Sequence, residues 1–296
     1  MPETVLLTGA TGYLGAALRS RAVVEGARCL AVGRRPRAEE GYRQLDLAAG
    51  PEAVAALLRA ERPQVIFHLA GGAAGDPFAL NLPPLRNLLA ALRSIPGYLP
   101  RLVTAGSAAE YGDLGPDPID EGARERPVTE YGVAKLAQAR LVALARRGGL
   151  PTVVGRVFNA IGPGMPPTLA SARFAREVRA AIASGARHVT VGDLSTVRDY
   201  LDVEDVAAAL WALGHGALSD PIVNVCSGEG VRTGEVLAEI QRQLGVSLEV
   251  RTDPGLVRGP FDVPVSVGRN DRLRAALGEA PRFSLPRAVA RLLDGG

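Results

Sequence analysis

The chain has 296 residues, a formal net charge of +3 and 47% hydrophobic residues, a composition typical of one large or two coupled globular α/β domains. Its arginines are scattered among acids, so we expect no nucleic-acid partner, and no apolar run is long enough to span a bilayer. No signal peptide is recognised, and Cys29 and Cys226 lie in apolar runs. We therefore expect a cytoplasmic protein with no membrane partner, no disulfide framework and no metal site.

The chain begins with an apolar run at residues 4–7 that predicts a buried strand, followed by glycines and an apolar-periodic helix up to Val24. Glycines in this turn let the backbone approach the pyrophosphate of a dinucleotide, and the helix N-terminus offers free N–H groups. A purely structural turn is the alternative, but the position as the first strand-to-helix turn favours cofactor binding. The predicted contacts are Gly9, Thr11, Gly12, Tyr13, Leu14 and Gly15.

The second strand, predicted over residues 28–32, ends at Gly33, Arg34 and Arg35. In dinucleotide-binding folds an acidic residue near this point holds the ribose 2′-hydroxyl of NAD, whereas an arginine accepts the 2′-phosphate of NADP. This chain has two arginines and no acid there, which favours NADP(H) over NAD(H). A solvated basic turn is the alternative.

Two later stretches are also predicted to border the cofactor. Asp46 and Leu47 follow a short strand and are placed beside the adenine, although Asp46 fits a loop-capping role equally well. Leu69, Ala70 and Gly71 end the next strand, and such small residues allow a ligand close to the backbone.

Strands and helices alternate through the rest of the N-terminal half, which predicts a Rossmann-type doubly wound parallel sheet covered on both faces. Pro83 and Pro84 are expected to break or kink one of the helices. The expected elements are helices over residues 51–62, 76–93 and 129–147 and strands over 64–69, 101–105 and 150–157.

Beyond residue 160 the pattern loosens into a smaller C-terminal α/β part. We expect an NADP-binding domain at residues 1–160, with a strand and helix from about 186–226 returning to it, and a mainly substrate-binding domain at 161–296. Asp202 is predicted to cap a helix that ends near Gly214.

The only lysine, Lys135, lies four residues after Tyr131, so the two share one face of the predicted helix. A tyrosine with a pKa of about 10 needs help to transfer a proton at neutral pH, and a nearby ammonium lowers that pKa. Ser107 ends the preceding strand, where such sheets meet their ligands. A surface pair on an amphipathic helix is the alternative, but the three residues together with the glycine turn favour catalysis.

These motifs, in this order, resemble the extended short-chain dehydrogenases/reductases. The resemblance covers nearly the whole chain and implies NAD(P) on the N-terminal half and a nucleotide sugar on the C-terminal half. The matching stretches are residues 8–15, 68–70, 81 with 87–89, 107 with 111–112, 131 with 135, 156–159 before 162–164, and 198–200 before 203–206.

Within the family, the chain resembles the GDP-4-keto-6-deoxy-mannose reductases on residues 106–112, 223–228 and 253–262. Carried over position by position, that similarity implies substrate contacts through the sugar, the ribose and the diphosphate. Ordinary salt bridges are the alternative for the two arginines. The implied contacts are Ser107, Ala108, Asn159, Arg198, Arg258 and Asp262.

Dehydratases of the family carry Asp-Glu just after the Ser or Thr, where this chain has Ala108 and Ala109, so dehydration is not expected. The resemblance implies NADPH-dependent reduction of the keto group, at C4, of a nucleotide-diphosphate 4-keto-6-deoxy-sugar, with Tyr131 as general acid, Ser107 and Lys135 assisting. An NAD-retaining nucleotide-sugar epimerase and a non-catalytic NADPH sensor are the alternatives. The resemblance also implies a homodimer.

Overall fold

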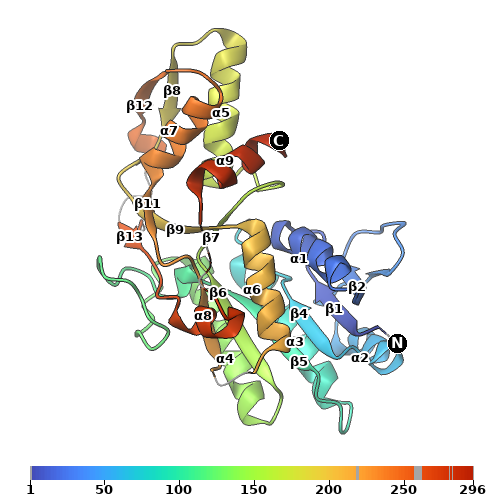
Figure 1. The fold of residues 1–296 in the computed structure, drawn as a ribbon. Coiled ribbons are helices and arrows are strands. Elements are labelled where there is room, and N and C mark those ends of the chain that lie inside the picture. Colours follow the sequence, from blue (N-terminus) through green and yellow to red (C-terminus); the bar gives the residue numbers. More distant parts are fainter. Residues whose placement is uncertain (1, 218–219, 257–261, 280, 282, 296) are drawn as a thin grey trace.

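The computed structural model contains a large sheet-based lobe and a smaller C-terminal lobe above it (Figure 1). The described residues are 2–217, 220–256, 262–279, 281 and 283–295.

Seven strands form the main sheet: β1 (Thr4–Thr8), β2 (Arg28–Gly33), β3 (Tyr42–Gln44), β4 (Val65–His68), β5 (Arg101–Ser107), β6 (Thr152–Val157) and β10 (Ile222–Val225). All neighbours are parallel, in the order β10–β6–β5–β4–β1–β2–β3. The arrangement of the first six is that of a doubly wound dinucleotide-binding sheet, which confirms the predicted fold class.

Helices cover both faces of this sheet: α1 (Tyr13–Val24), α6 (Val203–His215) and α8 (Asp271–Leu277) on one face, and α2 (Pro51–Glu61), α3 (Pro77–Arg93) and α4 (Glu130–Arg147) on the other. Alternate side chains of each strand point to opposite faces. In β1, Val5 and Leu7 join the core beneath α1 and α6, whereas Leu6 joins the core beneath α2 and α3. The apolar runs of the sequence are therefore buried on two sides.

Of the expected break or kink at Pro83 and Pro84, the break does not occur, because α3 runs through both prolines to Arg93. The prolines remove two backbone donors, but Leu85 and Leu88 are fully buried against the sheet and hold the helix in register. Packing of an apolar face outweighs the loss of two hydrogen bonds here.

The C-terminal lobe has its own core. Its elements are β7 (Asn159–Ile161), α5 (Ala170–Ser184), β8 (His188–Val191), β9 (Val197–Asp202), β11 (Gly230–Arg232), α7 (Thr233–Gln243), β12 (Glu249–Thr252), the 3-10 turn η2 (Pro254–Leu256), β13 (Val265–Ser266) and α9 (Leu285–Asp294). Strand β9 pairs with β7, β11 and β13, and β8 pairs with β12. The lobe therefore adds two small sheets, and β9 leads directly into α6 of the large lobe.

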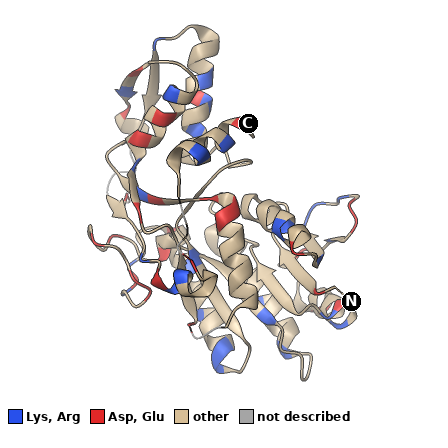
Figure 2. Cartoon of the chain, in the orientation of Figure 1, with Lys and Arg blue, Asp and Glu red and all other residues tan. Residues whose placement is uncertain are grey.

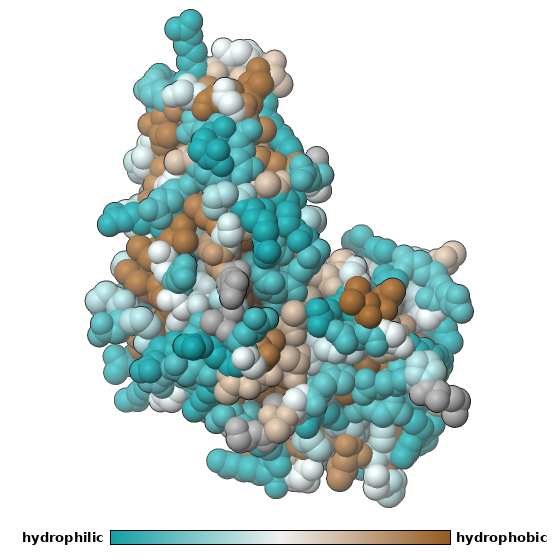
Figure 3. Space-filling view, in the orientation of Figure 1, coloured by the Kyte–Doolittle hydropathy of each residue, from teal (hydrophilic) through white to brown (hydrophobic). Residues whose placement is uncertain are grey.

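The two lobes are tied together where α6 begins. Asp202 caps α6 as predicted, accepting from the amide of Glu204 at 2.9 Å. Arg291 of α9 pairs with Glu204, and Arg287 lies 3.2 Å from Asp205, so acidic and basic groups face each other there (Figure 2). In the view of Figure 3 the surface is hollowed between the C-terminal lobe and the part of the large lobe that carries α1.

Within the described part of the chain, no helix combines the length and the apolar character needed to cross a membrane.

Candidate active site

The glycine turn joins the end of β1 to α1 and lies against the end of β4. Gly9 adopts a φ of +69°, and a Cβ there would lie 2.6 Å from the carbonyl carbon of Leu69. A Cβ at Gly15 would overlap the carbonyl oxygen of Gly9. Two of the predicted glycines are thus required by close backbone packing. Gly12 faces more open space, since its Cβ would come no closer than 3.2 Å to its nearest neighbour.

The N-terminus of α1 is suited to an anion. Gly12 is the N-cap, no side chain caps the helix, and the first turn contains no acid. The first amides of a helix lack intrahelical partners and lie at the positive end of its dipole. The glycine turn next to these amides fits the pyrophosphate of a dinucleotide.

Arg34 and Arg35 follow the end of β2 and are exposed. The Tyr42 hydroxyl donates to the carbonyl of Arg35 at 2.6 Å and fixes the backbone. In the described part of the chain neither guanidinium has a hydrogen-bond or ion-pair partner, whereas the nearby Arg37 pairs with Glu39 at 3.0 Å. Two unpaired cations at this position fit a phosphate on the adenosine ribose.

The other residues predicted to border the cofactor form hydrogen bonds within the protein or are buried. Asp46 accepts the amide of Ala48 at 2.9 Å and so shapes its own loop. Leu47 is buried, and its carbonyl accepts from Asn87 at 2.8 Å. Ala70 donates its amide to the Thr8 hydroxyl at 3.3 Å, which keeps the end of β4 beside the glycine turn.

Ser107 and Tyr131 come together at the carboxyl edge of the sheet. Ser107 ends β5, and the Thr129 hydroxyl caps α4 by accepting the amide of Gly132 at 3.1 Å. This cap starts the helix beside η1 (Ala108–Glu110). Burial raises the pKa of Tyr131, and a hydrogen bond with Ser107 opposes the rise.

Lys135 is buried, and two hydrogen bonds anchor its ammonium. It donates to the Ala105 carbonyl and, at 2.6 Å, to Oε1 of Gln138. Burial lowers the pKa of Lys135 to about 8, which leaves it mostly charged at neutral pH. Burial raises the pKa of Tyr131 in this arrangement, whereas the sequence-based expectation was that Lys135 lowers it.

Glu110 is a site residue to which the sequence assigned no role. It is fully buried directly behind Ser107, where Oε1 accepts the Ser107 amide at 2.8 Å and Oε2 accepts Nε of Arg156 at 2.7 Å. Its position within the motif around Ser107 was visible, but the buried partner Arg156 lies far away in the chain.

The residues expected to bind substrate bond to one another or to the backbone. Arg198 pairs with Asp262 at 2.7 Å, so two expected contacts are brought together. Asn159 donates to the carbonyl of Asp199 at 2.8 Å. Ala108 adjoins Ser107 in η1. Arg258 lies outside the described residues.

Asp199 is a second residue that the sequence did not assign a role. Its buried carboxylate accepts from the amides of Ser227, Gly228 and Gly268 at 2.7 to 3.2 Å and from the Ser227 hydroxyl at 2.7 Å. Burial raises its pKa to about 6. This carboxylate ties β9 to the segments after β10 and β13, next to Arg198.

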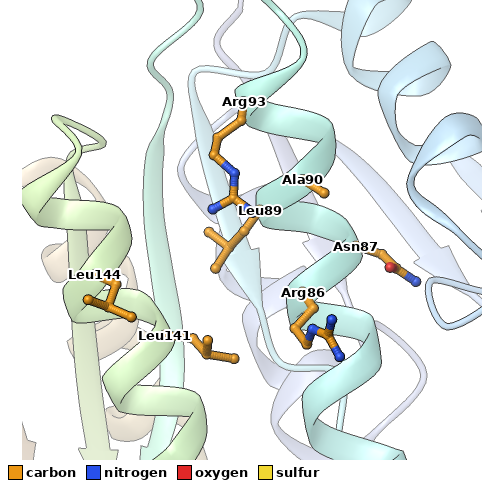
Figure 4. Close-up of a pocket in the computed structure, with 7 residues that line it drawn as sticks. All are labelled: Arg86, Asn87, Leu89, Ala90, Arg93, Leu141 and Leu144. Carbon is orange, nitrogen blue, oxygen red and sulfur yellow. The ribbon is translucent and has the colours of Figure 1, made fainter.

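A separate pocket of about 230 Å³ lies between α3 and α4 (Figure 4). It is lined by Arg86, Asn87, Leu89, Ala90, Arg93, Leu141 and Leu144. None of these residues belongs to the predicted site.

Comparison with known proteins identifies the family. Residues 5–226 match the family model described as "NAD dependent epimerase/dehydratase family". The chain belongs to this family. The resemblance inferred from the motifs is thereby confirmed, and the chain is that of an enzyme of this family.

Two curated relatives are similar over most of the chain. The dTDP-6-deoxy-L-talose 4-dehydrogenase (NAD(P)(+)) of Kitasatospora kifunensis is 29% identical, covering 98% of this chain and 95% of the relative. The GDP-6-deoxy-D-mannose reductase of Pseudomonas aeruginosa is 32% identical, covering 79% of this chain and 80% of the relative.

Two solved structures show the same fold. RMD from Pseudomonas aeruginosa, complexed with NADPH, is 27% identical with a TM-score of 0.84, and 99% of this chain and 98% of that chain are covered. The UDP-glucose 4-epimerase of Thermus thermophilus, complexed with NAD, is 28% identical with the same TM-score and coverage. A pyridine nucleotide is thus bound by both, but in different forms.

Proposed function

We propose that this protein is an NADPH-dependent reductase of a nucleotide-activated 4-keto-6-deoxy-sugar. The observation that carries the proposal is the pair of exposed guanidiniums of Arg34 and Arg35 at the end of β2, for which the described residues provide no partner. They suit the 2′-phosphate that distinguishes NADPH from NADH. The relatives named as a 6-deoxy-mannose reductase and a 6-deoxy-talose 4-dehydrogenase support a 6-deoxy-sugar that reacts at C4.

The cofactor would lie along the carboxyl edge of the sheet. The amides that begin α1 would bind its pyrophosphate, and the glycine turn leaves room for it. The bound nicotinamide would supply a hydride to the keto carbon. We propose that Lys135 binds the nicotinamide ribose after leaving the Ala105 carbonyl.

Tyr131 and Ser107 would act on the sugar oxygen. Ser107 accepts the amide of Ala109 at 3.2 Å, so its hydroxyl proton remains available to donate to the carbonyl. That donor stabilises the negative charge that develops on the oxygen. Tyr131 would then give its proton to the same oxygen as general acid. Burial keeps Tyr131 protonated, which is the form that this direction of reaction requires.

The nucleotide diphosphate would be recognised by side chains of the C-terminal lobe. Arg198 presents a planar cation that matches phosphate oxygens, and we propose that it leaves Asp262 to bind them. Asp262 would then accept a ribose hydroxyl. We propose Asn159 and Arg258 as further contacts on the grounds of the family resemblance.

The proposal is tested by NADPH absorbance on mixing the protein with GDP- or dTDP-4-keto-6-deoxy-hexose, with NADH in parallel. Oxidation of NADPH by one sugar nucleotide is the expected result. In the Arg34→Ala/Arg35→Ala variant the preference for NADPH over NADH should fall by about tenfold or more, because two charge-assisted hydrogen bonds are lost.

Arg37→Ala is the matched control. Arg37 is an exposed arginine of the same loop but is already paired with Glu39. Its removal should leave the cofactor preference unchanged. An unchanged preference in the double variant would refute the assignment of Arg34 and Arg35.

An NAD-retaining nucleotide-sugar 4-epimerase is the second candidate. It is favoured by the likeness to the NAD-bound UDP-glucose 4-epimerase structure. Purified protein that carries NAD and interconverts a nucleotide sugar with no net oxidation of NADPH would establish it. Dehydration is disfavoured, because Ala108 and Ala109 carry no group that transfers a proton.

We also propose that the protein forms a homodimer through α3 and α4. The pocket between them has an apolar floor, and Leu144 on its edge is 60% exposed. Light scattering coupled to gel filtration should give twice the chain mass, and Leu144→Glu should shift it toward the monomer. A monomeric wild-type protein would contradict this assembly.

A further inference from the structure

Glu110 is a buried charge that the proposed chemistry does not use. Its side chain is fully buried, as is that of Arg156, and the two form an ion pair at 2.7 Å. Buried ion pairs are weak evidence for stability, because desolvation offsets much of their attraction. Stability alone therefore does not explain why this ion pair lies next to Ser107.

The Glu110 carboxylate is held by Arg156, which is itself fixed by neighbouring residues. Oε2 accepts Nε of Arg156, and Nη2 of Arg156 also donates to Glu125 at 2.7 Å. The guanidinium lies 4.4 Å from the centre of the Tyr111 ring. The Tyr111 hydroxyl in turn donates to Asn224 at 2.7 Å. Because each residue of this hydrogen-bonded network is held by a residue from another part of the chain, Oε1 of Glu110 has a defined position.

That oxygen holds Ser107. Oε1 accepts the Ser107 amide at 2.8 Å, while the Ser107 hydroxyl accepts the amide of Ala109 at 3.2 Å. Gly106 leaves space for the carboxylate, since a Cβ there would lie 2.7 Å from Oε1. The two hydrogen bonds fix both the backbone and the hydroxyl oxygen of Ser107. The hydroxyl proton is thereby left to donate outward.

We propose that Glu110, anchored by Arg156, is a positioning residue that fixes Ser107 against Tyr131 and supplies the buried negative charge of this site. The proposal deepens the reductase assignment and rests on it for its kinetic test. Its geometric part stands apart from the reaction, because the hydrogen bond to Ser107 can be measured without substrate or cofactor.

The groups that face Glu110 determine how its charge affects the pKa values in the site. Arg156 approaches from β6, Lys135 and Tyr131 from α4, and Tyr111 from the segment after η1. Burial raises the pKa of Glu110 itself, and Arg156 and Lys135 oppose that rise and favour its charged form. Burial raises the pKa of Tyr131 and lowers that of Lys135, and the negative charge of Glu110 acts to raise both pKa values. Both groups are needed in their protonated forms for reduction, so loss of the charge moves the alkaline limit of activity to lower pH.

The test uses two variants of Glu110. Glu110→Asp keeps the charge but withdraws the carboxylate from Ser107 by one methylene. Glu110→Gln keeps the length but offers one acceptor oxygen to two donors and removes the charge. Both should speed hydrogen exchange of the Ser107 amide, measured by NMR on the protein alone, and lower kcat on the order of 10²-fold. Only Glu110→Gln should move the alkaline limit of kcat to lower pH.

Glu130→Gln is the matched control, because Glu130 precedes Tyr131 in the chain but is exposed. It should change neither the exchange of Ser107 nor the pH profile. Wild-type exchange of the Ser107 amide in Glu110→Asp, or wild-type kcat in that variant, would overturn the proposal. If Glu110→Gln fails to fold, Glu110→Asp alone decides. If no sugar nucleotide is reduced by the wild-type protein, the reductase assignment fails, and the exchange measurement still decides the role of Glu110.

Discussion

The cofactor side and the substrate side of the site are built from different parts of the chain. On the proposed cofactor side, the pyrophosphate would be met by the backbone: the turn at Gly9 and the amides that begin α1. On the proposed substrate side the groups are side chains such as Arg198 and Asp262, which pair with each other. The position of backbone binding groups is set by the fold itself. The position of side-chain binding groups also depends on the residues with which they form hydrogen bonds and ion pairs.

The largest expected effect is on the chemistry at the boundary between the two sides. Tyr131→Phe removes the proposed proton donor but keeps the ring, so kcat should fall on the order of 10²- to 10⁴-fold. NADPH binding, followed by fluorescence titration, should remain unchanged. Turnover at the wild-type rate would exclude Tyr131 as the general acid.

On the substrate side, Arg198→Ala should raise KM for the sugar nucleotide about ten- to hundredfold, through loss of a charged hydrogen-bond donor. Its effect on the KM for NADPH should be small. Arg251→Ala, at an exposed surface pair with Glu249 in the same lobe, is the control and should change neither constant. Equal changes in both KM values for Arg198→Ala would show that the two sides are not separable.

On the cofactor side, Gly15→Ala should cost about 1–3 kcal/mol of unfolding free energy, because the new methyl group overlaps the Gly9 carbonyl. It should also weaken NADPH binding, since the turn must open. Gly234→Ala, where the methyl group would lie 3.4 Å from its nearest neighbour, is the control for urea denaturation. If both variants are equally stable, backbone packing does not define the turn.

The smallest expected effect concerns the sheet beneath the cofactor side. His68 is buried, with Nδ1 3.0 Å from the Thr8 hydroxyl, and burial lowers its pKa from 6.5 to about 3. Between these values the folded protein binds fewer protons than the unfolded chain, so the free energy of unfolding falls as the pH falls. Linkage gives about 2 kcal/mol lost at about pH 5.

His68→Gln, which cannot bind the proton, should lose less stability than the wild type between about pH 7.5 and about pH 5. The measurement is urea denaturation at both pH values. A parallel pH dependence of the two proteins would mean that His68 does not remain neutral in the folded state.

The same contrast explains what the sequence could predict. Glycine spacing and apolar strands predicted the sheet, and the structure places Ser107 beside Tyr131, since parallel strands bring their carboxyl ends to one edge. The helix does not break at Pro83, one of the two outcomes expected there, because buried packing of α3 outweighs local propensity. The role of Glu110 could not be predicted, since its partner Arg156 lies 46 residues away. Nor does any local pattern pair Arg198 with Asp262.

The most direct test of the central claim follows the hydride itself. The protein is incubated with a 4-keto-6-deoxy sugar nucleotide and NADPH that carries deuterium at both hydrogen positions of C4 of the nicotinamide, and the product is examined by NMR and mass spectrometry. The account predicts one deuterium at C4 of the sugar for each NADPH oxidised. A product without deuterium, or an altered sugar with no NADPH oxidised, would contradict the reductase assignment.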